Sequence, residues 1–395
     1  ARQVGKTWLM KEFAGLEYNG QAPQALQPEQ PAQKDHLYLN FEASKDIHAI
    51  FEGSLDAARI LRALSIYSGR QLHPRNTLLL FDEIQACPRA LTSLKYFQEE
   101  APQIPIIAAG SLLGVSIHPE HSFPVGKVEF HHLHPLSFPE YLVAMGQSTL
   151  AELLQQPSDP LIDTFRELLI QHLRTYLVTG GMPEVVADYQ QHQDMNRVRE
   201  IQHRILLAYE QDFSKHAPPR EHPRIRMVWQ SVVGQLAKEN SKYVYGLLRQ
   251  GARAKEFEIA LTWLQDAGLI HKLHRISKPG IPLSSYADWS DFKVFLHDVG
   301  LLGAMAGLSP KILLQGNQLF EEFKGILTEQ YVMQQIKCLG IPAFYWSRTG
   351  ASAEIDLVIQ RDHRVVPIEV KASENLRSKS LRVYRELYQP GQCVR

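Results

Sequence analysis

The stretch that decides the fold is Ala1-Arg2-Gln3-Val4-Gly5-Lys6-Thr7, at the very start of the chain. Its last residues complete the phosphate-loop pattern GxxxxGK[ST], in which backbone N–H groups, here those of Val4 and Gly5 among them, face phosphate oxygens. Lys6 would reach the β- and γ-phosphates of ATP, and the Thr7 hydroxyl would hold Mg²⁺. The pattern's first glycine would precede Ala1, so we expect the chain to begin inside its own nucleotide site, without the strand that leads into the loop.

A second nucleotide-binding signal lies at Leu78-Leu79-Leu80-Phe81-Asp82-Glu83. The apolar run predicts a strand buried on both faces of a parallel sheet, and ligands bind at the carboxyl ends of such strands. Asp82 would support Mg²⁺ through water, and Glu83 would orient or deprotonate the attacking water. The alternative is a buried strand that ends at an acidic turn without a ligand.

A third strand candidate, Ile104–Ala109, ends at Gly110-Ser111. Ser111 would lie beside Asp82 and sense the γ-phosphate, or it simply caps the next turn. Strands at 36–41, 77–82 and 104–109 alternate with helical patterns at 54–66 and 90–100, which favours an α/β fold with a parallel sheet. The helix after the phosphate loop would carry Leu9, Phe13 and Leu16 on one side. Gly126–His131 is a candidate for a last strand.

The composition is that of an ordinary globular protein. The chain has 395 residues, with 42 basic and 42 acidic side chains, so its net charge favours neither nucleic acid nor a membrane as a partner. Three distant cysteines predict a reducing, cytoplasmic compartment and no disulfide framework. No apolar stretch approaches the roughly 18 residues of a membrane span, and no signal peptide is visible.

The middle of the chain changes pattern twice. Residues 146–225 have helical apolar spacing, with a break at Thr179–Pro183, and predict a helical lid or linker. Residues 226–305 predict three helices (226–238, 243–249 and 253–266) and a β-hairpin, the arrangement of a winged helix-turn-helix. Six basic residues could meet DNA phosphates: Arg249, Arg253, Lys255, Lys272, Arg275 and Lys278. The alternative is a structural or protein-binding winged helix whose basic residues are a solvated face.

The last part of the chain predicts a β-hairpin with a metal-nuclease pattern. Asp356 lies on one strand, and Glu369 and Lys371, two residues apart, would share a face of the next. In such an arrangement the two carboxylates hold Mg²⁺ and the lysine positions water and screens the phosphate. Glu329, on a predicted helix at 320–337, is a possible third acid. The alternative is a hairpin with cross-strand ion pairs and no metal.

Nearly the whole chain resembles bacterial and archaeal AAA+ superfamily ATPases with a C-terminal domain of unknown function. The matching segments, beyond those quoted above, are Leu80–Gln85, Gly110-Ser111, Pro124–Val128, Pro135–Phe138, Gly180–Pro183, Leu236–Asn240, Ala267–Ile270, Asp298–Leu302 and Ile368–Ala372. The resemblance implies an AAA-type ATP-binding domain followed by a winged helix and a PD-(D/E)xK restriction-endonuclease-like domain. Where these proteins often carry Gly-Arg, this chain has Gly126-Lys127, which puts a trans-acting arginine contact in doubt because lysine lacks the guanidinium fork.

The expected domains are therefore 1–145 (ATP-binding), 146–225 (helical lid or linker), 226–305 (winged helix) and 306–395 (nuclease-like). The first functional hypothesis is an ATPase that hydrolyses ATP with Mg²⁺ and couples nucleotide state to its C-terminal half. The second is a Mg²⁺-dependent DNA nuclease that ATP regulates. The third is a non-hydrolysing switch in which ATP controls binding to DNA or a protein partner. Oligomers are compatible with all three.

Overall fold

The computed structural model describes residues 3–18, 34–111, 126–156, 160–238, 242–315, 321–348, 353–371 and 379–395. The chain forms two compact units, Ala1–Leu133 and His134–Arg395. Within the described residues, none of the helices is both long enough and apolar enough to span a membrane.

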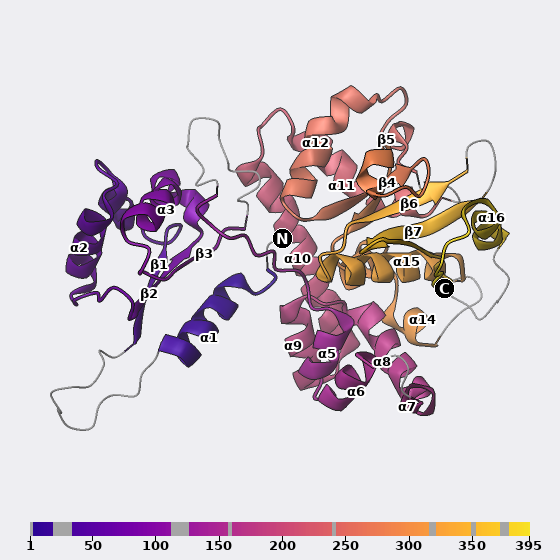
Figure 1. Ribbon diagram of the computed structural model, residues 1–395, viewed down its shortest axis with the longest axis horizontal. Helices are drawn as coiled ribbons and strands as arrows, with labels where there is room; N and C mark the ends of the chain where they lie inside the picture. The colour runs from indigo at the N-terminus through magenta and orange to yellow at the C-terminus, as the bar shows by residue number, and fades with distance from the viewer. Residues whose placement is uncertain are drawn as a thin grey trace. The chain divides into compact units, whose positions relative to one another are not determined.

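The N-terminal unit is an α/β structure around a parallel sheet (Figure 1). Its described elements are α1 (Lys6–Tyr18), β1 (Asp35–Asn40), the 3-10 helix η1 (Lys45–Phe51), α2 (Ala57–Ser68), β2 (Thr77–Asp82), the 3-10 turn η2 (Ile84–Ala86), α3 (Pro88–Glu100) and β3 (Ile106–Ala108). The described strands pair in parallel in the order β1-β2-β3, with Asn40 opposite Asp82. The parallel sheet with crossover helices is therefore confirmed.

Strand β2 is buried along its whole length, because helices cover both faces of the sheet. Leu79 and Phe81 pack on the side of α2 and α3, in the larger core cluster. Leu78 and Leu80 point the opposite way and pack against α1. The alternation follows from the two-residue period of a strand, and it explains why the β2 sequence is continuously apolar rather than alternating.

Helix α1 presents a different face to the sheet from the one that its apolar residues suggested. Met10 and Ala14, four residues apart, are buried against Leu78 and Leu80. Leu9, Phe13 and Leu16 are instead 49%, 43% and 75% exposed. The small Ala14 lets the helix lie close to the strands.

The expected strand at 126–131 is wrong. Residues 126–133 form turns and coil, and none of them pairs with a strand of the described sheet. Val128 packs against the core cluster, whereas Phe130 is 57% exposed. Apart from the partly buried Val128, residues 126–131 are exposed, and without a neighbouring strand their backbone groups form no ladder.

The C-terminal unit combines a helical part with a mixed sheet (Figure 1). Its described elements are α5 (Phe138–Ala144), α6 (Ser148–Leu154), α7 (Leu161–Thr164), α8 (Arg166–Thr179), α9 (Pro183–His192), α10 (Met195–His216), α11 (His222–Leu236), η3 (Tyr245–Leu247), α12 (Ala254–Asp266), β4 (Ile270–Ile276), η4 (Leu283–Tyr286), β5 (Ala287–Leu296), α13 (Val299–Met305), α14 (Pro310–Gln315), α15 (Glu321–Cys338), β6 (Ala343–Ser347), β7 (Glu354–Arg361), β8 (Arg364–Ile368) and α16 (Lys379–Tyr388). The described strands have the order β5-β4-β6-β7-β8, parallel at β4–β6 and antiparallel elsewhere.

The region expected to be a winged helix has most of the predicted elements. Helices α11 and α12 and the antiparallel hairpin β4–β5 are present, but the middle helix expected at 243–249 is only the 3-10 turn η3. Strand β4 also pairs with β6, so the sheet crosses the domain boundary expected at 305/306. A winged helix that is separate from the C-terminal domain stays a prediction.

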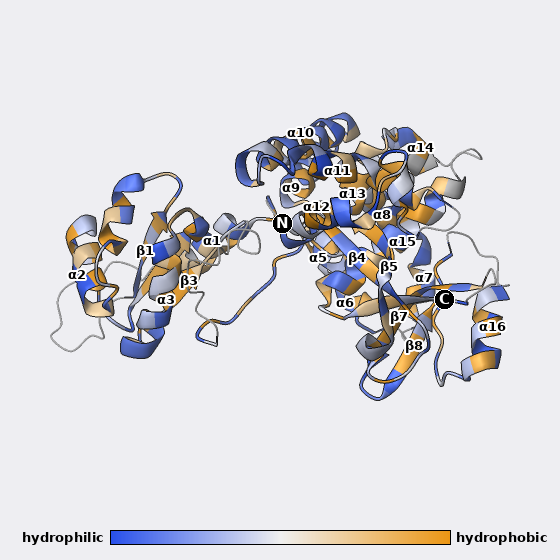
Figure 2. Ribbon diagram, turned by 90° about the horizontal axis from the view of Figure 1, so that it is seen from above, coloured by the Kyte–Doolittle hydropathy of each residue, from blue (hydrophilic) through white to orange (hydrophobic). Residues whose placement is uncertain are grey.

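A buried carboxylate joins three segments of the C-terminal unit. Asp298 is 0% exposed and accepts hydrogen bonds from the backbone N–H groups of Gly181 (2.7 Å) and Leu301 (2.9 Å) and from the Gln334 amide (3.2 Å). Burial raises the pKa of Asp298. Asp298 caps helix α13, in which Val299–Ala304 are buried; Figure 2 labels α13 among the helices of this unit. The carboxylate thus connects the ends of α8 and α13 to α15.

Glycine is required beside Asp298 because backbones approach closely there. A Cβ at Gly181 would lie 2.1 Å from the carbonyl oxygen of Leu136, and a Cβ at Gly300 would lie 2.5 Å from that of Thr179. Both neighbours are backbone atoms, which cannot turn aside as a side chain can.

We predict that Gly181→Ala lowers the free energy of unfolding of the C-terminal unit by about 1–3 kcal/mol, the usual cost of overpacking. Denaturant titration followed by tryptophan fluorescence is suitable, because four of the five tryptophans (Trp229, Trp263, Trp289 and Trp346) lie in this unit. Gly234→Ala in α11 is the control: nothing lies within 4 Å of its Cβ, and alanine in a helix stabilises by up to about 1 kcal/mol. Equal stability of the two variants would contradict the prediction.

Candidate functional site

The phosphate-loop residues form a tight turn that leads directly into α1. Gln3 and Gly5 both have positive φ angles, 62° and 85°. The first helical hydrogen bond runs from the N–H of Leu9 to the carbonyl of Gly5, at 2.9 Å. Val4 is 3% exposed and anchors the turn in the core. A turn of this kind, at the start of a 13-residue helix, is a type of backbone structure that binds anions through its N–H groups.

Thr7 and Asp82, 75 residues apart, are in hydrogen-bond contact. The Thr7 hydroxyl donates to Oδ2 of Asp82 at 2.7 Å. Asp82 ends strand β2 and is 2% exposed, and its Oδ1 accepts from the backbone N–H of Glu83 at 3.1 Å. The structure therefore brings together the two residues that the sequence assigns to Mg²⁺.

Glu83 and Ser111 lie beside this contact. The Ser111 hydroxyl donates to Oε2 of Glu83 at 3.0 Å, and the Gln85 amide donates to the same oxygen. Glu83 has a left-handed backbone conformation, with φ 50° and ψ 43°. A non-glycine residue pays about 1–2 kcal/mol for that conformation, and such strain is concentrated at functional sites. Ser111 contacts Glu83 rather than Asp82, its expected neighbour.

Three further side chains, which the sequence did not single out, complete this network. The Tyr38 hydroxyl donates to Oδ2 of Asp82 at 2.8 Å, and the Asn40 amide donates to the Tyr38 oxygen at 3.3 Å. The ammonium of Lys11, one helical turn after Thr7, lies 4.1 Å from the centre of the Tyr38 ring. The alternation of β1 was an available signal: Leu37 and Leu39 belong to the α2/α3 side, so Tyr38 and Asn40 must face the phosphate loop.

The donor set fits ATP with Mg²⁺. Mg²⁺ prefers oxygen ligands, which Thr7 and Asp82 supply, and the loop amides and the Lys6 ammonium suit phosphate oxygens. The hydrogen bonds that Asp82 receives from Thr7, Tyr38 and the Glu83 amide come from neutral groups, which orient the carboxylate without neutralising it. A separate hollow of about 570 Å³ lies beside α3 and β3, and none of the loop residues, Asp82, Glu83 or Ser111 lines it.

The residues of the second predicted site also lie close together. Asp356 lies on β7, and its Oδ2 accepts the backbone N–H of Val370 at 2.7 Å. Glu369 and Lys371 lie just beyond the end of β8 at Ile368, not within the strand as expected, and form an ion pair of 2.8 Å. Burial raises the pKa of Asp356 to about 7, together with the negative charges of Glu329 and Glu369. The four predicted residues therefore belong to one electrostatic cluster.

The sequence missed two members of this cluster, Lys293 and Glu354. The ammonium of Lys293, on β5, is 2.6 Å from Glu354 and 3.9 Å from Glu329, and its side chain is 1% exposed. Burial lowers the pKa of Lys293, but the carboxylates around it outweigh that effect and the net shift is upward. A lysine inside the apolar run Phe292–Leu296 was the signal, because a buried charge requires a partner.

The C-terminal cluster does not form a ready metal site. Within the parts of the chain that the structure describes, no three His, Cys, Asp or Glu side chains are grouped so that they could hold a metal ion. In this arrangement, a cation there would have at most two carboxylate ligands, Asp356 and Glu369. Lysines already neutralise part of the negative charge.

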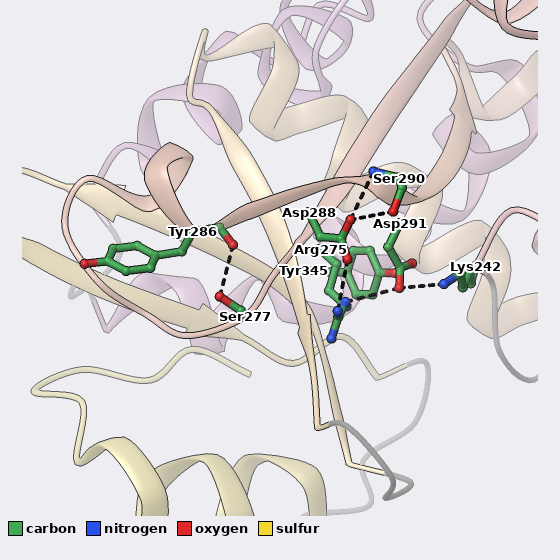
Figure 3. Close-up of polar contacts among 8 residues, drawn as sticks. All are labelled: Lys242, Arg275, Ser277, Tyr286, Asp288, Ser290, Asp291 and Tyr345. Carbon is green, nitrogen blue, oxygen red and sulfur yellow. Dashed lines mark hydrogen bonds and ion pairs between the residues drawn. The ribbon is translucent and has the colours of Figure 1, made fainter.

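The basic residues expected to meet DNA are partly engaged within the protein. Arg275 lies 3.1 Å from each of Asp288 and Asp291, and Asp291 also binds Lys242 and the Tyr345 hydroxyl (Figure 3). Arg249 forms an ion pair of 2.7 Å with Glu256. An arginine with carboxylate partners gains less from a phosphate, so Arg249 and Arg275 are poorer candidates for DNA contacts than the sequence suggested.

Comparisons with known proteins agree with the first site. The family model of an AAA domain matches residues 1–142. Two models described as domains of unknown function match residues 170–312 (DUF8612) and 324–394 (DUF4143). No curated protein is significantly similar in sequence.

Among solved structures, the Walker-type ATPase PABY2304 of Pyrococcus abyssi is 13% identical, with a TM-score of 0.44, over 77% of this chain and 89% of that chain. At this identity and TM-score, the similarity supports no conclusion about the fold or function of this chain. The AAA match, with the Thr7–Asp82 contact, supports an ATP-binding P-loop ATPase in the N-terminal part of the chain.

Proposed function

We propose that the protein binds ATP with Mg²⁺ through residues 1–142, hydrolyses it, and uses the nucleotide state to control its C-terminal half. The observation that carries the proposal is the 2.7 Å hydrogen bond between Thr7 and Asp82, which joins the phosphate loop to the end of β2. The AAA-domain match over the same residues supports it.

Each residue has a chemical role in this proposal. Lys6 binds the phosphates, and Thr7 and Asp82 hold the Mg²⁺, which neutralises phosphate charge when bound. Glu83 orients or deprotonates the attacking water. Its hydrogen bonds from Ser111 and Gln85 hold the carboxylate in place. In this proposal Ser111 is the sensor that links the γ-phosphate to Glu83.

A second candidate function is a Mg²⁺-dependent DNA nuclease in the C-terminal sheet. The observation that favours it is that three predicted residues, Asp356, Glu369 and Lys371, belong to one cluster. Asp356 lies on β7, Glu369 and Lys371 follow β8, and Glu329 on α15 adds a further negative charge. Asp356 and Glu369 would hold the cation and Lys371 would position water. A non-hydrolysing ATP switch is the outcome if ATP binds and neither ATP nor DNA is cleaved.

The ATPase proposal predicts different failures for two substitutions. Lys6→Ala should abolish measurable ATP binding in calorimetry, because the ammonium that meets the phosphates is lost. Glu83→Gln should retain ATP binding and lose about 100-fold or more of turnover, since the amide is no base. Lys45→Ala, an exposed lysine of the same unit, is the control. Unchanged ATP affinity in Lys6→Ala would refute the proposal.

The nuclease candidate predicts that the full chain cleaves DNA with Mg²⁺ and that Asp356→Ala does not. The exposed Glu386→Ala on α16 is the matched acidic control and should cleave like the original chain. If DNA stays intact with the original chain, or if Asp356→Ala cleaves as fast, the candidate fails.

The pKa of Asp356 predicts a pH dependence of stability that is independent of any cleavage. In the unfolded chain an aspartate titrates near 3.9, whereas the folded pKa is about 7. Between these values the folded chain holds the proton and the unfolded chain does not, so the free energy of unfolding falls as pH rises from about 4 to about 7. Asp356→Asn should lack this decline and be more stable than the original chain at pH 8.

Denaturant titrations between pH 5 and pH 8, with a chelator present, measure this effect. Glu386→Gln should keep the decline of the original chain, because that carboxylate is exposed. The same slope in Asp356→Asn and the original chain would disprove the assignment of the raised pKa to Asp356.

A further inference from the structure

The hydroxyl of Tyr38 lies beside the residues assigned to Mg²⁺. It donates to the same carboxylate oxygen, Oδ2 of Asp82, that accepts the hydrogen bond from Thr7. The three residues come from β1, β2 and α1. Tyr38 therefore connects the two residues assigned to the metal, from a strand that carries no part of the phosphate-loop pattern.

The direction of the Tyr38 hydrogen bond is determined by its neighbours. The Asn40 amide donates to the Tyr38 oxygen at 3.3 Å, so that oxygen acts as an acceptor there and its own proton points to Asp82. The Lys11 ammonium lies 4.1 Å from the ring centre, and a cation over the ring withdraws electron density from the hydroxyl and strengthens it as a donor. Both neighbours thus favour donation to Asp82.

Donation to Asp82 matters for Thr7 as well. A hydroxyl has one proton and two lone pairs, so Thr7, which donates its hydrogen bond to Asp82, keeps its lone pairs for a metal ion. Asp82 accepts this hydrogen bond in the observed geometry because other donors orient its carboxylate. The Glu83 N–H donates a hydrogen bond to Oδ1 at 3.1 Å, and the Tyr38 hydroxyl donates an independent one to Oδ2.

We propose that Tyr38 is a positioning residue for the Mg²⁺ of the nucleotide site, and that it orients Asp82 and, through Asp82, the Thr7 hydroxyl. This inference rests on the proposed binding of ATP with Mg²⁺. It predicts a selective defect: loss of the Tyr38 hydroxyl weakens the contribution of Mg²⁺ to nucleotide binding but leaves the contacts of the loop with phosphate intact.

The test is calorimetry of ADP binding to the full chain, once with Mg²⁺ and once with a chelator. Tyr38→Phe should reduce the Mg²⁺-dependent gain in ADP affinity about tenfold, the effect of losing one hydrogen bond to a charged group, and leave the affinity in chelator unchanged. Asn40→Ala should cause a smaller loss of the same kind. It removes the amide that directs the Tyr38 proton, together with the hydrogen bonds that Asn40 Oδ1 accepts from the backbone N–H groups of Glu42 (3.0 Å) and Ala43 (2.8 Å). Tyr67→Phe on α2, 48% exposed, is the control.

The outcomes separate this inference from the proposed function. A Tyr38→Phe variant that gains as much affinity from Mg²⁺ as the original chain, or one that loses affinity equally with and without Mg²⁺, would overturn the positioning role. If Tyr38→Phe does not fold, Asn40→Ala decides by the same criterion. If the original chain binds ADP without any gain from Mg²⁺, the proposed Mg²⁺ site itself fails, and the role of Tyr38 fails with it.

Discussion

The N-terminal unit depends on one constraint, the carboxylate of Asp82, which is 2% exposed at the end of a buried strand. A buried charge without hydrogen-bond donors is strongly unfavourable, so neighbouring elements must supply them. They come from Thr7 on α1, Tyr38 on β1 and the backbone N–H that follows Asp82. The order β1-β2-β3 and the packing of α1 over Leu78 and Leu80 place these donors correctly. The requirement of one carboxylate thus accounts for the approach of the phosphate loop to the strand.

The sequence predicted this site because the positions of its residues follow from the topology of the sheet. Parallel strands end at one edge of a sheet, so Asp82 and Ser111 had to lie near the loop whatever the details of packing. The role of Tyr38 was not predictable in this way, because it depends on which strand lies beside β2. The prediction of which face of α1 is buried was wrong for a similar reason. Met10 and Ala14 are buried because they face the sheet, whereas the larger Leu9 and Phe13 do not. Lys293 required partners from distant elements, which a local pattern does not identify.

In the C-terminal unit, several segments that carry the family resemblance pack against one another through their backbones. The backbone N–H of Leu136 donates to the carbonyl oxygen of Gly181 at 2.7 Å, and the N–H of Gly181 donates to the carboxylate of Asp298. The glycine residues there allow backbones to approach within distances that a Cβ would prevent. Close packing of the backbone therefore explains the Gly180-Gly181 motif, which is not evidence for a ligand site.

The two candidate sites differ in how they compensate negative charge, and this difference ranks the functional hypotheses. The hydrogen bonds that Asp82 receives in the structure come from hydroxyl and amide groups, which orient a carboxylate without neutralising it. In the C-terminal cluster the ammonium groups of Lys293 and Lys371 already pair with Glu354 and Glu369. A cation entering that cluster must compete with two lysines, whereas the hydroxyl and amide donors to Asp82 carry no charge. This difference favours the nucleotide site over the C-terminal cluster as the proposed place for Mg²⁺.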